Sequence, residues 1–349
     1  MPRLPDRPDE LTAELLGGVM GPHLNGAVIA TALVLEAAEG TNRRARVQLS
    51  YAKGSGPEHV VVKWHGPLLN RLALLALGAH DAEARLAASG ICLPLTSPRW
   101  YGAERVPARL GSLVVMEDVT AAGGRPNDAR RPLSLDEVAS GLTGLARLHA
   151  AWWDRPLPAA LDFCRPWRLG RAFAPISAAS LARGRQKARR AGLALGREGG
   201  ALVLERQFRA HAASAATGPQ SLLHGDPHPG NTYATAEGGT GFYDWQLVRR
   251  GNAVHDVSYF MISSLAPTER RQEERALLGH YRAALGAAGV HPPSEAALWR
   301  RHVAAPAFGL ATWLHTLSFG RFQDDEVSHV TIARFAAANR ELSSWQALA

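Results

Sequence analysis

Cysteine, lysine and long apolar runs are all scarce in this chain of 349 residues. Its two cysteines, Cys92 and Cys164, are isolated and lack the paired spacing of a zinc site, which fits a reducing cytoplasm. No apolar run reaches the roughly 18–20 residues that a membrane span needs. The first residues also lack the apolar core of a signal peptide. The sequence therefore predicts a cytoplasmic protein with no membrane partner.

Acidic residues are outnumbered by basic ones, and the formal net charge of +8 raises the question of a nucleic-acid partner. The arginines are mostly scattered, and the densest patch, residues 183–197, has no interleaved aromatics on which bases would stack. We interpret this patch as a solvated helix face and expect no nucleic-acid partner. A position over a substrate site, where the patch would favour an anionic or neutral substrate, stays open.

The length and the composition, 46% hydrophobic and 20% charged, indicate a globular chain of two domains or lobes. Residues 1–117 read as a smaller lobe of strands and helix, and residues 118–349 as a larger, mainly helical lobe. We expect a monomer or a weak homodimer.

The most informative segment is Leu222-Leu-His-Gly-Asp-Pro-His-Pro-Gly-Asn231, followed by Phe242-Tyr-Asp-Trp-Gln246. Two short β-prone runs flank a turn at residues 236–241, which predicts a hairpin. A turn centred between Glu237 and Gly238 would place Asn231 opposite Asp244, roughly 5 Å away. Two oxygen ligands at that distance suit one magnesium ion. Asp226, just before the hairpin, is placed to accept a proton from a substrate hydroxyl.

This order of His, Asp, Asn and a second Asp resembles the catalytic loop of the protein-kinase-like fold. With Gly225 after the histidine and Asp-Trp-Gln at the metal position, it resembles the aminoglycoside phosphotransferase and choline kinase-like family of small-molecule kinases. The resemblance implies an α+β, two-lobed protein-kinase-like fold with a small β-sheet N-lobe, one long helix in that lobe and a larger helical C-lobe. It also implies Asp226 as the catalytic base, Asn231 and Asp244 as Mg²⁺ ligands, and ATP, with GTP left open, as the phosphoryl donor.

Lysine is rare, with only Lys53, Lys63 and Lys187 present, so its placement is informative. Lys63 ends a valine-rich strand pattern and resembles the kinase lysine that contacts the α- and β-phosphates as a point charge. Residues 68–89 are rich in leucine and alanine and predict one helix. Within this helix we expect Glu83, in preference to Asp81, to be the partner of Lys63. A strand lysine at a sheet edge and a solvated helix glutamate are the structural alternatives.

Two further parts of a nucleotide site follow from the resemblance. The apolar strand 111–119 resembles the hinge between kinase lobes, with Met116 lining the adenine pocket and the Glu117 carbonyl and Val119 amide binding the adenine edge. A hairpin of strands 28–38 and 44–52, with Gly40 in its turn, would lay backbone amides over the phosphates.

Other functions stay open beside an ATP-dependent phosphotransferase acting on a small-molecule hydroxyl. One is a pseudokinase-like scaffold that binds nucleotide without turnover. The other is a metal-dependent hydrolase built on His224, Asp226, His228 and His255. The sequence does not identify the acceptor. We expect Asp256 to support the catalytic loop from a helix start, and the acidic cluster 324–326 to be a solvated turn.

Overall fold

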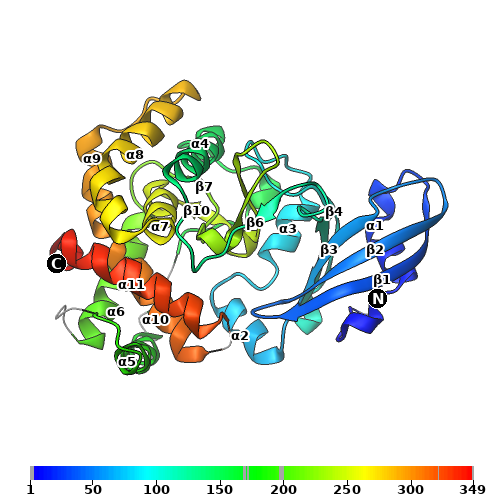
Figure 1. Ribbon diagram of the computed structural model, residues 1–349, viewed down its shortest axis with the longest axis horizontal. Coiled ribbons are helices and arrows are strands. Elements are labelled where there is room, and N and C mark those ends of the chain that lie inside the picture. The colour runs from blue at the N-terminus through cyan, green and yellow to red at the C-terminus, as the bar shows by residue number, and fades with distance from the viewer. Residues whose placement is uncertain (1–3, 168–169, 171–172, 196–199, 321, 348–349) are drawn as a thin grey trace.

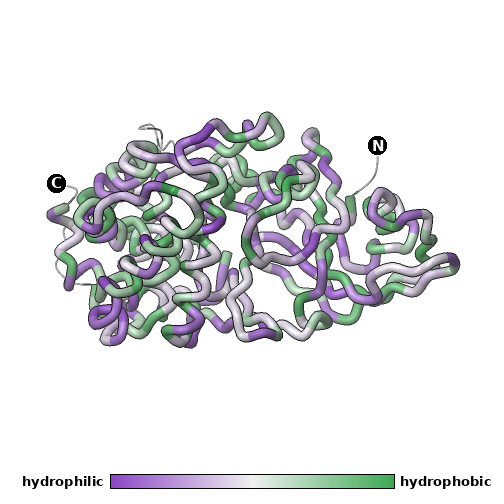
Figure 2. The backbone as a smooth tube through the Cα atoms, turned by 90° about the horizontal axis from the view of Figure 1, so that it is seen from above, coloured by the Kyte–Doolittle hydropathy of each residue, from purple (hydrophilic) through white to green (hydrophobic). Residues whose placement is uncertain are grey.

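The computed structural model describes residues 4–167, 170, 173–195, 200–320 and 322–347. Its long strands gather at one end and most of its helices at the other (Figure 1). A perpendicular view again places the two parts side by side (Figure 2). The expected α+β kinase-like arrangement, an N-terminal sheet followed by a mainly helical part, is confirmed.

One antiparallel sheet of five strands, in the order β1-β2-β3-β5-β4, forms the core of the N-terminal part. Its strands are β1 (Val28–Glu39), β2 (Arg43–Lys53), β3 (His59–Trp64), β4 (Trp100–Val106) and β5 (Gly111–Glu117). Helices α1 (Ala13–Met20), α2 (Leu68–Ala76) and α3 (Ala82–Ala88) accompany it, with short 3₁₀ turns η1 (Pro8–Glu10), η2 (Gly21–His23) and η3 (Pro107–Arg109).

Strand β3 shows how the pleat separates core from site. Val60, Val62 and Trp64 are buried in the cluster that also contains residues of α1. Because successive side chains point to opposite faces of a strand, Val61 and Lys63 face the other way. Val61 packs with the small cluster that holds Met116 and the Ala84 of α3. The alternation therefore directs the lysine toward α3.

The single helix expected over residues 68–89 is wrong, because the stretch forms two helices, α2 and α3. The break contains Gly78, whose φ of +66° lies in the left-handed region that ends helices. Leucine and alanine favour helix throughout, but this glycine lets the chain turn. The turn allows α3 to approach the sheet separately from α2.

The C-terminal part is built from helices around short strands. Its helices are α4 (Leu135–Ala151), α5 (Ala174–Arg190), α6 (Ala201–Ala215), α7 (Val254–Ser264), α8 (Pro267–Ala287), α9 (Glu295–Ala304), α10 (Pro306–Phe319), α11 (Asp325–Glu341) and α12 (Ser344–Ala347), with the 3₁₀ turn η4 (Ala159–Leu161). Strand β7 (Ser221–Leu223) pairs with β10 (Arg249–Gly251), and β6 (Arg125–Pro126) and β9 (Thr240–Phe242) flank β8 (Thr232–Ala234). Across the described ranges, no helix combines the length and apolarity of a membrane span.

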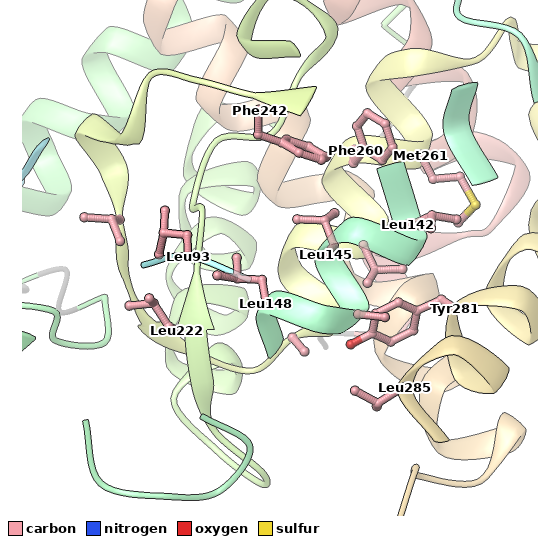
Figure 3. Packing of buried hydrophobic residues seen from close by; sticks show 14 of the residues in the cluster. Leu93, Leu142, Leu145, Leu148, Leu222, Phe242, Phe260, Met261, Tyr281 and Leu285 are labelled. Carbon is pink, nitrogen blue, oxygen red and sulfur yellow. The ribbon is translucent and has the colours of Figure 1, made fainter. Parts of the chain in front are cut away.

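Helix α4 packs against β7 and β9, the strands on either side of the candidate site loop. It begins with a capping box, in which Ser134 and Glu137 satisfy each other's backbone amides. Its Leu142, Leu145 and Leu148 point into a core shared with β9 and α7, as Figure 3 shows for Phe242 and Phe260. These buried side chains pack against the hairpin that carries the candidate site residues.

Helices α5 and α10 pack so closely that only glycine fits at one position. A Cβ added to Gly184 would lie 2.1 Å from the backbone oxygen of Leu314. We expect Gly184→Ala to lower the free energy of unfolding by about 1–3 kcal/mol, because backbone cannot yield as a side chain does. Gly279→Ala in α8 is the matched control, since nothing lies within 4 Å of its added Cβ and alanine favours helix. Urea unfolding of both variants measures the contrast, and equal stabilities would contradict this packing.

Candidate active site

The catalytic loop starts at a glycine that no other residue replaces easily. Gly225 follows β7 with a φ of +88°, and an added Cβ would lie 2.1 Å from the backbone oxygen of Leu247. A side chain here would meet both backbone strain and a clash. The close approach explains why glycine, and not the arginine common in protein kinases, follows His224.

Asp256 holds this loop from the first turn of α7. Its carboxylate accepts hydrogen bonds from the backbone amides of His224 at 2.6 Å and Gly225 at 3.0 Å, and it lies 3.3 Å from His149 Nε2. Burial alone would raise the pKa of Asp256, but the hydrogen bond and charge of His149 lower it below its usual value. The support that the sequence predicts from a helix start is present.

The hairpin register differs by one residue from the expected one. Thr232 pairs with Phe242, and the Asn231 carbonyl accepts from the Tyr243 amide at 3.1 Å, so Asn231 lies opposite Tyr243 and not Asp244. The turn closes around Glu237, with Gly238 at a φ of +82°. Asp244 follows the strand in a left-handed conformation, φ +62° and ψ +66°, which is rare for a non-glycine residue and typical of functional sites.

Lys63 brings the sheet, α3 and the hairpin together. Its Nζ lies 2.7 Å from Glu83 Oε2 and 2.5 Å from Asp244 Oδ1. The second oxygen of Glu83 accepts from the Trp245 amide at 3.1 Å. Glu83 is therefore the partner of the lysine, whereas Asp81 bonds Arg105 instead.

The charges of this trio follow from burial and pairing. Burial alone would lower the pKa of Lys63, but Asp244 and Glu83 outweigh it and raise that pKa. Burial would raise the pKa of Asp244, but Lys63 reverses this and lowers it. Burial raises the pKa of Glu83 against the attraction of Lys63. The lysine and Asp244 thus carry opposite charges.

Asp226 lies beside the hairpin in a different environment. Its backbone oxygen accepts from Asn231 Nδ2 at 2.9 Å, and its Oδ2 lies 3.4 Å from the same nitrogen. Burial raises the pKa of Asp226 to about 8, with the nearby charge of Asp244 adding to the shift. A carboxylate with a raised pKa is a good proton acceptor near neutral pH.

The donor set fits a magnesium ion. Because Asn231 uses its amide nitrogen toward Asp226, its Oδ1 is left as a ligand atom. Asp244 uses Oδ1 toward Lys63, and its side chain is 34% exposed, which leaves Oδ2 as a second candidate ligand atom. Two protein oxygens with room for water and phosphate oxygens match the chemistry of Mg²⁺.

The expected hinge residues end the sheet. Met116 is buried against α3, and Glu117 is the last residue of β5, bonded through its amide to the Arg99 carbonyl at 2.8 Å. The Val119 carbonyl accepts from Gly124 at 2.7 Å, while no backbone partner within the described ranges takes the Val119 amide.

The β1–β2 turn contains site contacts that sequence reasoning missed. Asn42 Nδ2 donates to Gln246 Oε1 at 2.9 Å, and the buried Asn70 donates to the carbonyls of Gly40 and Thr41 at 3.2 Å. Gly40 itself has no positive φ. An asparagine inside the leucine-rich run 68–77 was the available signal, because a buried amide there needs a partner.

The hydrolase alternative finds no assembled metal site. His224 bonds the Tyr243 carbonyl and His228 caps a turn through the Gly230 amide, while His255 lies against His211. Among the residues described, no group of three His, Cys, Asp or Glu side chains is arranged to hold a metal ion.

We expect Asp256→Asn to be less stable than the parent by about 1–3 kcal/mol at neutral pH, because an amide cannot accept both loop hydrogen bonds. The pKa of Asp256 is lowered on folding, so its contribution is present above an unfolded pKa of about 4 and lost as the pH falls below it. The stability gap should therefore narrow in acid. Urea unfolding of parent and variant at neutral pH and below a pH of about 4 measures this difference in stability, with the exposed Asp162→Asn as the control. A difference that does not change with pH would contradict the role of the Asp256 carboxylate.

Comparison with known proteins gives a consistent family. The sequence pattern of the phosphotransferase enzyme family matches residues 37–288. No curated protein matches the chain in sequence. Similar solved structures include a spectinomycin phosphotransferase in complex with ADP and spectinomycin, with 14% identity, 95% of this chain and 100% of that chain covered, and a TM-score of 0.51.

Two more structures show the same fold. An amicoumacin kinase in complex with AMP-PNP and Ca²⁺ has 14% identity, covers 88% of each chain and has a TM-score of 0.52. A putative aminoglycoside phosphotransferase from Ralstonia eutropha has 12% identity, covers 94% of this chain and 95% of that one, and has a TM-score of 0.51. The expected enzyme class is confirmed: the chain is a small-molecule kinase and belongs to the phosphotransferase enzyme family.

Proposed function

We propose that this enzyme transfers the γ-phosphoryl group of ATP to a hydroxyl group of a small molecule, with residues 1–117 as the nucleotide-binding lobe and 118–349 as the catalytic lobe. The observation that carries the proposal is the Lys63 ammonium, paired with Glu83 at 2.7 Å and with Asp244 at 2.5 Å. This arrangement joins the expected phosphate-binding cation to the expected metal ligand. The nucleotide complexes of two similar structures, one with ADP and one with AMP-PNP and Ca²⁺, support ATP as the donor.

In this mechanism Lys63 binds the α- and β-phosphates, and Glu83 holds the lysine in place. Asn231 and Asp244 would hold Mg²⁺, which neutralises charge on the phosphates when bound. Met116, the Glu117 carbonyl and the Val119 amide bind the adenine base. The β1–β2 turn around Gly40 covers the phosphates.

Asp226 orients the acceptor and takes its proton. As the new bond forms between the acceptor oxygen and the γ-phosphorus, the bond from that phosphorus to the β–γ bridging oxygen breaks and ADP leaves. The acceptor proton passes to the Asp226 carboxylate. Positioning and charge stabilisation supply most of the rate enhancement.

The acceptor we propose is neutral or anionic. Helix α10 places Trp313 against His228 of the catalytic loop, and α5 packs on α10; neither helix contains Asp or Glu. The acidic cluster 324–326 is exposed at the start of α11, and Glu326 pairs there with Arg130 at 3.1 Å. A polycation would find few carboxylates beyond the catalytic ones.

Two substitutions should separate the roles of the carboxylates. We expect Asp226→Ala to lower turnover by about 10²–10⁴-fold, the contribution of a positioned base, with magnesium–AMP-PNP affinity nearly unchanged. Asp244→Ala should weaken that affinity and reduce its magnesium dependence. ADP release and calorimetric titration measure the two effects. Parental turnover in Asp226→Ala would exclude the base assignment, and binding of magnesium-nucleotide without product from any alcohol would favour the scaffold.

A panel of alcohols tests the acceptor class. At equal concentrations, we expect kcat/KM for neutral or anionic alcohols to exceed that for polycationic aminoglycosides by about tenfold or more, because the site offers cations few partners. Coupled detection of ADP gives the ranking. A higher kcat/KM for an aminoglycoside would overturn the proposed class.

A further inference from the structure

Three buried aromatic side chains, one of the loop and one each of α7 and α10, have no role in the mechanism above. Tyr259 of α7, Trp313 of α10 and His228 of the loop are 4%, 3% and 5% exposed. His228 Nε2 lies 3.9 Å from Asp226 Oδ2, and the His228 ring meets Trp313 edge-on at 5.2 Å. Tyr259 lies one helical turn beyond Asp256, which already bonds the loop.

Two polar atoms of this group lack partners. Tyr259 Oη interacts with Asp226 and Trp313 but has no hydrogen bond within ordinary distance and angle limits, and Trp313 Nε1 is likewise buried without one. Buried polar atoms left unpaired are unfavourable, and they mark functional sites or adjustable networks.

The chemistry of the three groups allows one order of hydrogen bonds. An indole nitrogen only donates, and an ionised carboxylate only accepts. A hydroxyl between them must therefore accept from Trp313 and donate to Asp226. The order of donors and acceptors in this network therefore has one direction.

The catalytic carboxylate needs such a contact. Within the described chain, Asn231 Nδ2 donates a long hydrogen bond of 3.4 Å to its Oδ2, and His228 Nε2 lies 3.9 Å from the same oxygen. Its side chain is 26% exposed. A hydrogen bond from a hydroxyl on the buried side would fix the rotamer of Asp226. It would leave the second carboxylate oxygen free to contact the acceptor substrate.

We propose that Tyr259, oriented by Trp313, is a positioning residue that fixes the Asp226 carboxylate for proton transfer from the acceptor. The effect on turnover rests on the proposed function, whereas the contact itself does not. The two parts are therefore tested by separate measurements.

The first measurement uses Tyr259→Phe, which removes only the hydroxyl, with Ser264→Ala as control. Ser264 is buried in the same helix, and its hydroxyl has no hydrogen-bond partner in the described structure. ADP formation from magnesium-ATP is followed with the best alcohol of the panel, and with water as acceptor. We expect kcat to fall about tenfold or more in Tyr259→Phe, with the Kd of magnesium–AMP-PNP unchanged, and Trp313→Phe to show a smaller fall.

The second measurement is a thermal double-mutant cycle of Tyr259→Phe with Asp226→Ala, which needs no activity. We expect Tyr259→Phe to lower Tm in the parent by roughly 2 °C more than in Asp226→Ala. Additive shifts would overturn the contact. Coupled shifts with unchanged kcat, or a parallel loss of nucleotide affinity, would overturn the positioning role. If the unsubstituted enzyme showed no turnover, the proposed function would be wrong. The double-mutant cycle would still show whether Tyr259 contacts Asp226.

Discussion

The site depends on one buried ammonium group. Lys63 is pinned between Glu83 and Asp244, so the sheet, α3 and the catalytic hairpin meet at a single charge. A buried cation without partners is strongly unfavourable, and breaking a buried pair costs several kcal/mol. The buried ion pairs therefore say little about the overall stability of the fold. They do require the sheet, α3 and the hairpin to lie close together, because the buried charge of Lys63 is tolerated only with its partners.

Backbone conformation adds a second constraint, and it is also local to the site. Gly225 and Asp244 both adopt positive φ, one against the Leu247 carbonyl and the other directly beside the lysine. Such conformations persist only where the surroundings determine them. At the loop, Asp256 holds the backbone conformation by accepting hydrogen bonds from the amides of His224 and Gly225. At Asp244, the contact with Lys63 holds it.

The sequence carried the side-chain chemistry but not the details of backbone geometry. The loop and its two partners, Lys63 and Glu83, could be predicted because residue type and order are set by the reaction. The register at Asn231 was wrong by one residue, since the symmetric-turn argument ignored the left-handed Asp244. The helix break at Gly78 and the contacts of Asn42 and Asn70 depend on tertiary packing, which propensity does not encode. The lobe boundary and the site roles stay predictions.

Environment divides the work between the two carboxylates more sharply than residue type does. Asp244 touches an ammonium, so its pKa falls and it stays charged. Asp226 has no such cation in contact, and burial raises its pKa to about 8. Pairs of groups whose surroundings separate their pKa values are the ones that can act as ligand and base in one site. The Asp226 side chain is 26% exposed, so protein groups on its buried side are the ones that can fix its orientation. This is why the unpartnered hydroxyl of Tyr259 is best understood together with the reaction and not as part of the core.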